Sequence, residues 1–429
     1  MRIAIYTLGC KVNQYETQAL EGELTKRGHT LVNFTDEADV YVVNTCSVTA
    51  ISDKKSRQML RQAKRRNPNA IIAACGCYAQ THEAEVRALA PDVLFGTNDR
   101  TRFLDAIEEA YQKRRPVISV DDVWARRSFE LLPAGGLDGR TRAMMKIEDG
   151  CVNFCSYCII PYARGRVRSL PMEKAREQII SLREAGYREV VLTGIEISSY
   201  GKDLDGDVSL IDLLELLSRE SGGMRLRLGS LEPRTVTEEF CRRAAALPNL
   251  CPHFHLSMQS GCDETLRRMN RKYDTARFLK SCDLLRRWFE SPAITTDLIV
   301  GFPEETDAEF AATLDFIRRC AFAEIHIFPY SIRPGTKAAE MKQLPNAIKE
   351  ERAQIAAQVA EEMQTDYLSA CIGKEFDVLF EQDIGGRSVG HAPNYAEVSV
   401  AAKGLHNVIK RVKIVALEGH TLLAEGVER

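Results

Sequence analysis

The sequence contains no run of 18 apolar residues, and its first residues lead directly into polar, motif-rich sequence. A membrane-spanning helix needs about 20 mostly apolar residues and a secretory signal needs an apolar core, so we expect neither. We therefore expect a cytoplasmic protein without a membrane partner. With 45% apolar and 28% charged residues, the composition also excludes a largely disordered or collagen-like chain.

The chain also lacks a net charge that would identify its partners. It carries 58 basic and 60 acidic residues, a formal charge of −2, which excludes a uniformly basic coat but not a local basic stripe. Thirteen cysteines are an odd number, and without a secretion signal they argue against a disulfide framework. Metal or redox chemistry is the better expectation for cysteines that cluster.

The length of 429 residues predicts several domains, of which we expect three. The first region alternates short apolar strands with charged helical segments. The predicted strands cover 3–8, 40–44 and 70–74, and the predicted helices cover 14–27, 53–66 and 83–90. This pattern is typical of a small parallel α/β domain, which we place at 1–116. Residues 117–140 contain Pro133-Ala134-Gly135-Gly136 and mixed charges, and are predicted to form a linker.

The middle region, 141–367, repeats a strand–helix unit six times, which predicts an incomplete barrel. The predicted strands cover 143–147, 189–193, 225–229, 253–258, 295–300 and 324–328. A charged helix at about 346–368 follows. The last region, 368–429, changes to alternating strands such as 375–380 and 408–415 with Gly-rich turns, which predicts a small all-β barrel.

The strongest local signal is a CxxxCxxC run, Cys151 to Cys158, directly after the first barrel strand. Three thiolates are soft ligands that suit an iron–sulfur cluster, whereas structural zinc needs four ligands and no fourth Cys or His is near. A 4Fe–4S cluster held by Cys151, Cys155 and Cys158 leaves one iron open for a small molecule.

Three further cysteines each follow a predicted strand of the first domain: Cys10, Cys46 and Cys77. The carboxyl ends of parallel strands meet at one edge of a sheet, so the three thiols are expected to converge as ligands. The alternative is that these three cysteines are simply small buried residues at strand ends. Cys75 lies outside the pattern; we interpret it as lining the sheet, although an exchange with Cys77 stays open. The other six cysteines lack ligand spacing and are interpreted as structural.

The CxxxCxxC loop, with Tyr157 before its last cysteine, resembles that of the radical S-adenosylmethionine (SAM) superfamily. The resemblance implies that the open iron binds SAM and that an electron from the cluster splits SAM into methionine and a 5′-deoxyadenosyl radical. It also implies a partial (β/α)6 barrel and an external electron donor such as a flavodoxin or ferredoxin. The SAM contacts implied by the resemblance or by strand-end position are Tyr157, Thr193, Gly194, Glu196, Ser230 and Gln259.

The segments around the other three cysteines, Thr7 to Asn13, Asn44 to Val48 and Gly76 to Gln80, resemble those of the methylthiotransferases, a radical SAM subgroup. The resemblance covers essentially the whole chain. It implies an auxiliary 4Fe–4S cluster on Cys10, Cys46 and Cys77, and a C-terminal TRAM-like domain that holds the substrate macromolecule. A sulfur of the auxiliary cluster, methylated by a second SAM, would then replace a hydrogen that the radical activates.

Three substrates of this family stay open: isopentenyl-adenosine in tRNA, threonylcarbamoyladenosine in tRNA, and an aspartate of a ribosomal protein. The stretch Ala163 to Arg168 is most similar to the threonylcarbamoyladenosine type. We expect Arg164, Arg166 and Arg168 to bind tRNA phosphates or the threonyl carboxylate, unless they are arginines of a solvated loop. On the C-terminal barrel, the expected tRNA contacts are Lys410, Arg411 and Lys413.

Two other functional classes fit the sequence less well. An RNA-binding protein with structural clusters would need closed, four-ligand sites, which the two three-cysteine sets oppose. A radical SAM enzyme acting on a small molecule would need no macromolecule-binding barrel. His253 and His255 alternate on a strand and are interpreted as barrel residues rather than ligands, and Asp297 as a group that orients a polar partner or caps a turn.

Overall fold

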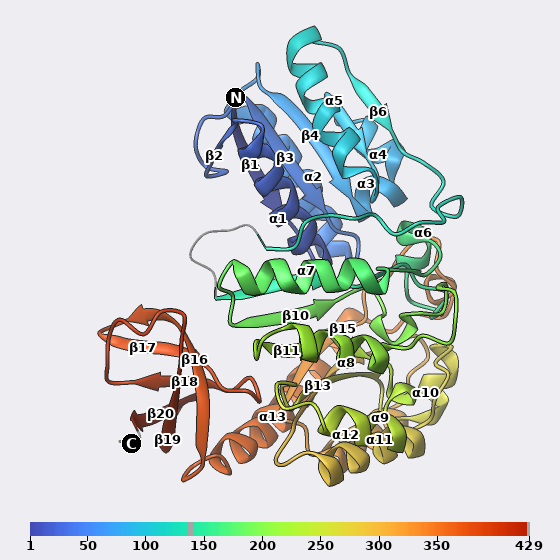
Figure 1. Cartoon of the computed structure of the whole chain (residues 1–429). Helices are drawn as coiled ribbons and strands as arrows, with labels where there is room; N and C mark the ends of the chain where they lie inside the picture. The colour runs from blue at the N-terminus through green and yellow to red at the C-terminus, as the bar shows by residue number, and fades with distance from the viewer. Residues whose placement is uncertain (136–140, 427–429) are drawn as a thin grey trace.

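The computed structural model describes residues 1–135 and 141–426, which form an N-terminal sheet domain, a central barrel domain and a C-terminal β-barrel (Figure 1). Residues 136–140 of the predicted linker and the last three residues of the predicted C-terminal domain lie outside this range. Within the described residues, no helix is long and apolar enough to cross a membrane. The predicted combination of an α/β N-terminal domain, a partial barrel and a small all-β barrel is confirmed.

The N-terminal domain is a six-stranded, all-parallel sheet with strand order β2-β1-β3-β4-β5-β6. Helices α1 and α5 cover one face, while α2, α3 and α4 cover the other. The strands are β1 (Arg2–Thr7), β2 (Thr30–Val32), β3 (Val40–Thr45), β4 (Ile71–Gly76), β5 (Val93–Phe95) and β6 (Val117–Ser119). The helices are α1 (Lys11–Lys26), α2 (Ala50–Arg66), α3 (Cys77–Thr81), α4 (Glu83–Arg87) and α5 (Arg100–Lys113).

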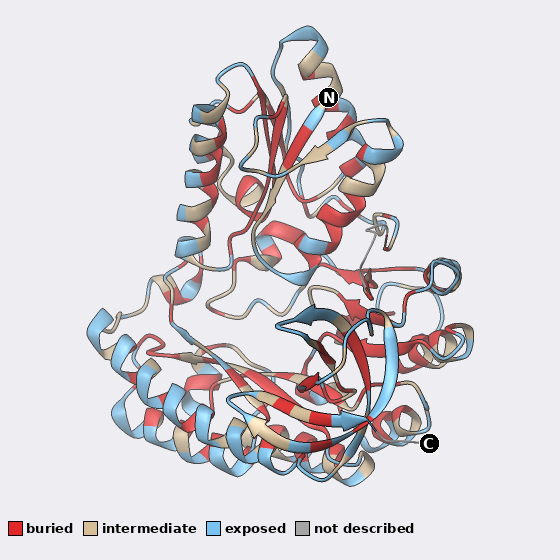
Figure 2. Cartoon of the chain, turned by 90° about the vertical axis from the view of Figure 1, so that its left-hand side faces the viewer, coloured by how far each residue is buried: buried red, intermediate tan, exposed pale blue. Residues whose placement is uncertain are grey.

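The three strands predicted for this domain are all present, and every residue of β3 and β4 is buried because helices cover both faces (Figure 2). Three short strands, the edge strands β2 and β6 and the inner strand β5, were not predicted, since three residues are too few to show a pattern. Strand β6 lies within the predicted linker. Its residues Val117–Ser119 pair with Val93–Phe95 and complete the sheet, so the linker starts later than predicted.

The barrel domain contains the six predicted strand positions, but its strands form two sheets, β11-β10-β7 and β12-β13-β14-β15. The division falls at Gly229, between β11 and β12. The strands are β7 (Arg142–Lys146), β10 (Glu189–Thr193), β11 (Arg225–Leu228), β12 (Ser230–Leu231), β13 (His253–Gln259), β14 (Ala293–Val300) and β15 (Glu324–Pro329), with the short pair β8 (Glu148–Asp149) and β9 (Arg168–Ser169). The long helices are α7 (Met172–Glu184), α8 (Leu210–Glu220), α9 (Glu238–Ala245), α11 (Thr275–Trp288), α12 (Asp307–Cys320) and α13 (Asn346–Ser369). Shorter elements are α6 (Ile160–Arg164), α10 (Asp263–Arg268), η1 (Ile197–Ser199), η2 (Pro233–Thr235) and η3 (Lys337–Ala339).

Helix α13 leads to the C-terminal barrel, in which five strands close in the order β16-β17-β18-β20-β19. The strands are β16 (Glu375–Ile384), β17 (Arg387–His391), β18 (Glu397–Val400), β19 (Val408–Glu418) and β20 (Thr421–Gly426). This barrel contacts the barrel domain through arginines of β7 and β11: Arg142 forms an ion pair with Glu381 at 2.7 Å, and Arg227 donates a hydrogen bond to the carbonyl of Pro393 at 2.9 Å.

The N-terminal domain is joined to the barrel domain by a buried cluster of charges centred on Glu16 of α1. Arg164 of α6 forms an ion pair with the Glu16 carboxylate and donates a hydrogen bond to Asn13 at 2.8 Å. Arg100 and Lys146 also reach Glu16, at 2.7 and 3.2 Å. The side chains of Glu16, Arg100, Arg164 and Lys146 are all at most 1% exposed, so each charge depends on its partners.

These partners keep the Glu16 carboxyl group ionised. Burial alone would raise its pKa, but the charges of Arg164, Arg100 and Lys146 override burial and hold the pKa well below its ordinary value. Because the folded-state pKa is depressed, the stabilisation is present at neutral pH and is lost as the pH falls through that depressed value.

We expect Arg164→Met to lower the apparent melting temperature of the protein by several degrees, while Arg166→Met leaves it unchanged. The substitution removes the ion pair with Glu16 and the hydrogen bond to Asn13 and leaves Glu16 with Arg100 and Lys146, so the cost is at most the roughly 3–5 kcal/mol of a buried pair that loses one partner. Arg166 is exposed on the same loop and serves as the matched control. Thermal unfolding followed by circular dichroism at pH 7 measures both; equal melting temperatures would contradict the role of the Glu16 cluster.

Candidate functional site

The CxxxCxxC loop lies between the short strands β8 and β9, whose antiparallel pairing closes its two ends. The backbone NH of Cys151 donates to the carbonyl of Gly165 at 3.0 Å. Gly150 has a φ of +93°, and a Cβ at this position would stand 1.9 Å from the carbonyl oxygen of Arg166, so only glycine fits before the first cysteine. The sequence thus holds the loop against the barrel mouth.

Residues that follow β13 fix the middle of the loop and bring one positive charge to it. The Ser156 NH and hydroxyl donate to the carbonyls of Met269 and Arg268, at 3.0 and 2.8 Å. Arg271 donates to the Cys155 sulfur at 3.2 Å. Sequence analysis did not identify Arg271, because it stands 116 residues after Cys155 and no local spacing connects them. Its charge would stabilise a cysteine-bound, anionic cluster.

A cavity of about 140 Å³ lies directly against this loop. The three cysteines line it together with four of the predicted SAM contacts, Tyr157, Glu196, Ser230 and Gln259. Gln259 has a φ of +67°, an uncommon backbone for a non-glycine residue, at the carboxyl end of β13. Tyr157 packs edge-on against Phe302, with ring centroids 6.4 Å apart.

The predicted SAM contacts from Thr193 to Glu196, at the end of β10, line two different cavities. Glu196 caps η1 through the NH of Ser198 and lies 3.4 Å from the Asn153 side chain in the cysteine loop, so it faces the first cavity. Thr193 and Gly194 instead line a second, larger cavity. The two cavities share Ser230, at the start of β12.

The three N-terminal cysteines stand at the carboxyl ends of β1, β3 and β4, and their joint role as ligands stays a prediction. Cys10 precedes α1, Cys46 follows β3 and Cys77 begins α3. A Cβ on Gly9 would stand 2.6 Å from the Cys46 sulfur. Burial raises the pKa of Cys77 to about 12; Arg164 opposes this shift, and the thiols of Cys46 and Cys10 add to it. A set of three thiols suits a soft metal centre, in which metal-bound thiols are deprotonated outright.

Cys75 belongs to a different environment. It is fully buried in the core between the sheet and helices α1 and α5, and burial raises its pKa to about 11. Its side chain therefore packs within the apolar core, as the sequence interpretation stated.

The second cavity, of about 490 Å³, is lined by Cys10 and shares Ser230 with the first cavity. Its lining includes Cys10, Lys11 and Val12 from the N-terminal domain and Ser230 beside the first cavity. Polar side chains of three neighbouring barrel strands complete it: His253, His255, Thr295, Asp297, Glu324 and His326. A molecule held there would contact Cys10 at one end and reach the first cavity at the other.

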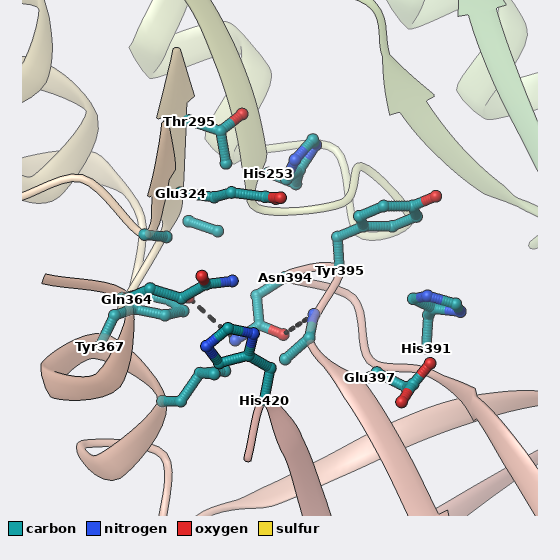
Figure 3. Close-up of a pocket in the computed structure, with 14 residues that line it drawn as sticks. His253, Thr295, Glu324, Gln364, Tyr367, His391, Asn394, Tyr395, Glu397 and His420 are labelled. Atoms are coloured by element: carbon teal, nitrogen blue, oxygen red, sulfur yellow. Dashed lines mark hydrogen bonds between the residues drawn. The ribbon is translucent and has the colours of Figure 1, made fainter. Parts of the chain in front are cut away.

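A third cavity, of about 260 Å³, lies where the barrel domain meets the C-terminal barrel (Figure 3). His253, Thr295, Glu324 and Tyr395 line both this cavity and the second one. Tyr395 has a φ of +71° and stacks on His391, with ring centroids 4.7 Å apart. The C-terminal barrel thus contributes a wall to the second cavity.

The structure corrects the prediction for two of the three loop arginines. Arg164 and Arg168 are 0% and 2% exposed, and both pair with Asp149. Arg164 pairs across the domain interface and Arg168 pairs within the barrel domain, so neither is available to bind tRNA or a threonyl carboxylate. Arg166 is exposed and lies over the ring of Trp124 at 5.9 Å.

On the C-terminal barrel, the three predicted basic residues of β19, Lys410, Arg411 and Lys413, are all exposed. The Arg411 guanidinium forms ion pairs with Glu375 and Asp377, at 3.1 and 3.6 Å. None of the three lines the cavities described above.

If Cys10, Cys46 and Cys77 hold the auxiliary cluster that the sequence predicts, Cys77→Ala loses that cluster, whereas Cys75→Ala keeps it. Two 4Fe–4S clusters correspond to about eight irons per chain, so Cys77→Ala should retain about four. Iron and acid-labile sulfide are measured after anaerobic reconstitution. Loss of iron in Cys75→Ala, with full iron in Cys77→Ala, would reverse the ligand assignment.

Comparisons with known proteins agree with this geometry. The Uncharacterized protein family UPF0004 matches residues 2–96, and the Radical SAM superfamily matches residues 145–317. A solved structure of the radical SAM methyltransferase TsrM from Kitasatospora setae aligns with a TM-score of 0.57 at 16% identity, covering 79% of this chain and 77% of that one. At this identity, the match supports the fold.

Curated relatives match nearly the whole chain. The threonylcarbamoyladenosine tRNA methylthiotransferase MtaB of Bacillus subtilis is 39% identical, over 99% of this chain and 95% of the relative. The MtaB of Thermotoga maritima is also 39% identical, over 88% and 86%. A tRNA-2-methylthio-N(6)-dimethylallyladenosine synthase of Pelotomaculum thermopropionicum is 32% identical, over 97% and 95%. The chain is therefore an enzyme of the methylthiotransferase family within the radical SAM superfamily, which implies SAM and a 4Fe–4S cluster as cofactors.

Proposed function

We propose that this enzyme transfers a methylthio group to carbon 2 of threonylcarbamoyladenosine, next to the anticodon of tRNA, with SAM and two 4Fe–4S clusters. The observation that carries the proposal is the second cavity, which has Cys10 on one wall and adjoins the cysteine loop through Ser230. One bound base could therefore meet both cysteine sets. The names of the most similar relatives considered support the same substrate.

The polar lining of the second cavity favours a threonylcarbamoyl group over an isopentenyl group. The threonylcarbamoyl group offers a carboxylate, a hydroxyl and a urea to side chains such as Lys11, Asp297 and His326. An apolar isopentenyl group would leave these polar groups without partners, which costs free energy when they are buried from water. This argument replaces the one that sequence analysis built on Arg164 and Arg168.

The carbon 2 hydrogen of adenine is not acidic, so its replacement calls for radical chemistry. When bound, the two clusters would supply an electron for SAM cleavage and a sulfur for transfer. In our proposal Cys151, Cys155 and Cys158 hold one cluster and Cys10, Cys46 and Cys77 the other. Arg271 donates to the Cys155 sulfur and balances its charge. Tyr157, Glu196, Ser230 and Gln259 orient SAM in the first cavity, and a flavodoxin or ferredoxin in the cytoplasm serves as electron donor.

An aromatic ladder beside the cysteine loop supports a tRNA contact there. Trp124 and Phe154 stack with centroids 5.7 Å apart at 10°, and Tyr162 meets Phe154 edge-on at 5.9 Å. Phe154 and Tyr162 are 39% and 47% exposed, and Arg166 covers Trp124. Exposed rings with a nearby guanidinium bind unstacked bases irrespective of sequence. We propose that this ladder holds the anticodon loop, together with Lys410, Arg411 and Lys413.

The substrate is tested by nucleoside mass spectrometry of tRNA from cells that lack the gene. The methylthio form of threonylcarbamoyladenosine should disappear, return with the wild-type gene, and stay absent with Cys155→Ala or Cys77→Ala. Cys241→Ala, a buried cysteine of α9 remote from both sets, is the matched control and should restore it. If the knockout instead loses methylthio-isopentenyl-adenosine, or changes no tRNA nucleoside, the proposed substrate is wrong.

Trp124→Ala should weaken tRNA binding by about five- to a hundredfold, because stacking on an aromatic side chain contributes about 1–3 kcal/mol per base. SAM cleavage measured without tRNA should not change. The chain has one other tryptophan, Trp288 of α11, which is hydrogen-bonded to Glu238, and Trp288→Ala is the control. If filter binding gives the two variants equal affinity for tRNA, the aromatic ladder is not part of the tRNA interface.

A further inference from the structure

Three side chains of the second cavity are placed together by the register of neighbouring parallel strands. His255 lies on β13, Asp297 on β14 and His326 on β15, and Asp297 is directly paired with His326. His255 is paired with Thr295, two residues before Asp297, so all three side chains lie on the same face of the sheet. All three line the second cavity.

The donor atoms of this trio converge on one point. One ligand atom from each of the three side chains lies within 4.8 Å of the others. His255 Nε2 is 3.3 Å from Asp297 Oδ2. That separation is longer than a charge-assisted hydrogen bond, and it matches two ligands that each lie about 2.1 Å from a shared ion.

A neighbouring hydroxyl orients the first histidine for metal binding. His255 Nδ1 lies 3.0 Å from the Thr295 hydroxyl. If Nδ1 carries the proton and donates it to Thr295, the Nε2 lone pair faces Asp297 and the cavity. A second hydrogen bond of this kind commonly fixes the tautomer of a metal-binding histidine.

The donor set also indicates the class of ion. Two imidazoles and one carboxylate on one side of an ion form a facial triad, which suits divalent transition metals and keeps the other coordination positions open. Here the open side faces a cavity of about 490 Å³. A closed structural site would need a fourth protein ligand, so the arrangement fits an ion that binds something else.

The charge of the cavity supports a cation as well. Lys11 is its one ammonium group, while Asp297 and Glu324 are two carboxylates, so with neutral histidines these side chains sum to one negative charge. The two carboxylates oppose the attraction that Lys11 exerts on a substrate carboxylate. One divalent cation turns the sum to one positive charge, which attracts it.

We propose that His255, Asp297 and His326 bind a divalent transition-metal ion whose open positions ligate the carboxylate of the substrate's threonyl group. The metal-binding part of this inference rests on the geometry of the trio. The substrate-contact part rests on the proposed function. It revises the sequence interpretation of His255 as a plain barrel residue.

Metal binding is tested by equilibrium dialysis of the cluster-loaded enzyme against Mn²⁺, with manganese counted by elemental mass spectrometry so that cluster iron does not interfere. The wild type should bind one Mn²⁺ per chain, and Asp297→Asn and His326→Gln should bind it at least about tenfold more weakly. His253→Gln removes an imidazole from the same cavity outside the trio and should bind as the wild type does.

His326 is half exposed, so we expect His326→Gln to fold even if Asp297→Asn unfolds. Cluster iron content and melting temperature report on the folding of each variant. No stoichiometric Mn²⁺ on the wild type, or equal affinity in folded His326→Gln, would overturn the site.

The substrate contact is tested with two synthetic anticodon stem-loops, one carrying threonylcarbamoyladenosine and the other unmodified adenosine. Mn²⁺ should tighten binding of the modified stem-loop alone, measured by fluorescence anisotropy, and His326→Gln should lose this effect. An equal effect of Mn²⁺ on both stem-loops would overturn the carboxylate contact. Mn²⁺ binding needs no tRNA, so a failed nucleoside experiment with an intact Mn²⁺ site would reject the proposed function and leave the metal site standing.

Discussion

The buried carboxylate of Glu16 is the constraint on which the arrangement of the site depends. It belongs to the N-terminal domain, yet two of its cationic partners, Lys146 and Arg164, belong to the barrel domain and flank the CxxxCxxC loop. Asn13, which receives a hydrogen bond from Arg164, stands three residues after Cys10. A charge buried this deeply tolerates little displacement of its partners. The interface therefore fixes the two cysteine sets relative to each other, which two domains joined only by a linker would not do.

The first and second cavities differ in size and in the residues that line them. The smaller one lies under the cysteine loop and is built from strand ends and loops at the barrel mouth. The larger one is open to Cys10 and lined by side chains of β13, β14 and β15. Their common wall at Ser230 falls where the barrel strands split into two sheets, at the break between β11 and β12. The irregularity of the barrel is thus located where two ligands must meet.

Sequence was most informative where chemistry follows from local spacing. The CxxxCxxC run and the rule that parallel strands end at one edge were enough to name six candidate ligand cysteines, because each needs only a strand boundary, and their ligand role stays a prediction. The arginines show the limit of that reasoning. Arg164 and Arg166 are the same residue type two positions apart, but one is buried against Glu16, 148 residues earlier, and the other is exposed. Arg271 and Trp124 also act through distant partners, which no periodicity reveals.

Tyr395 links the C-terminal barrel to the chemistry of the larger cavity. Its ring lies under the guanidinium groups of Arg142 and Arg227, at 5.1 and 4.7 Å, and it borders two of the three cavities. The C-terminal barrel therefore forms part of the wall of the larger cavity as well as a surface on the outside of the enzyme. Exchanging this domain between related enzymes would alter the shape of that cavity, so substrate choice and the C-terminal domain are expected to have diverged together during evolution.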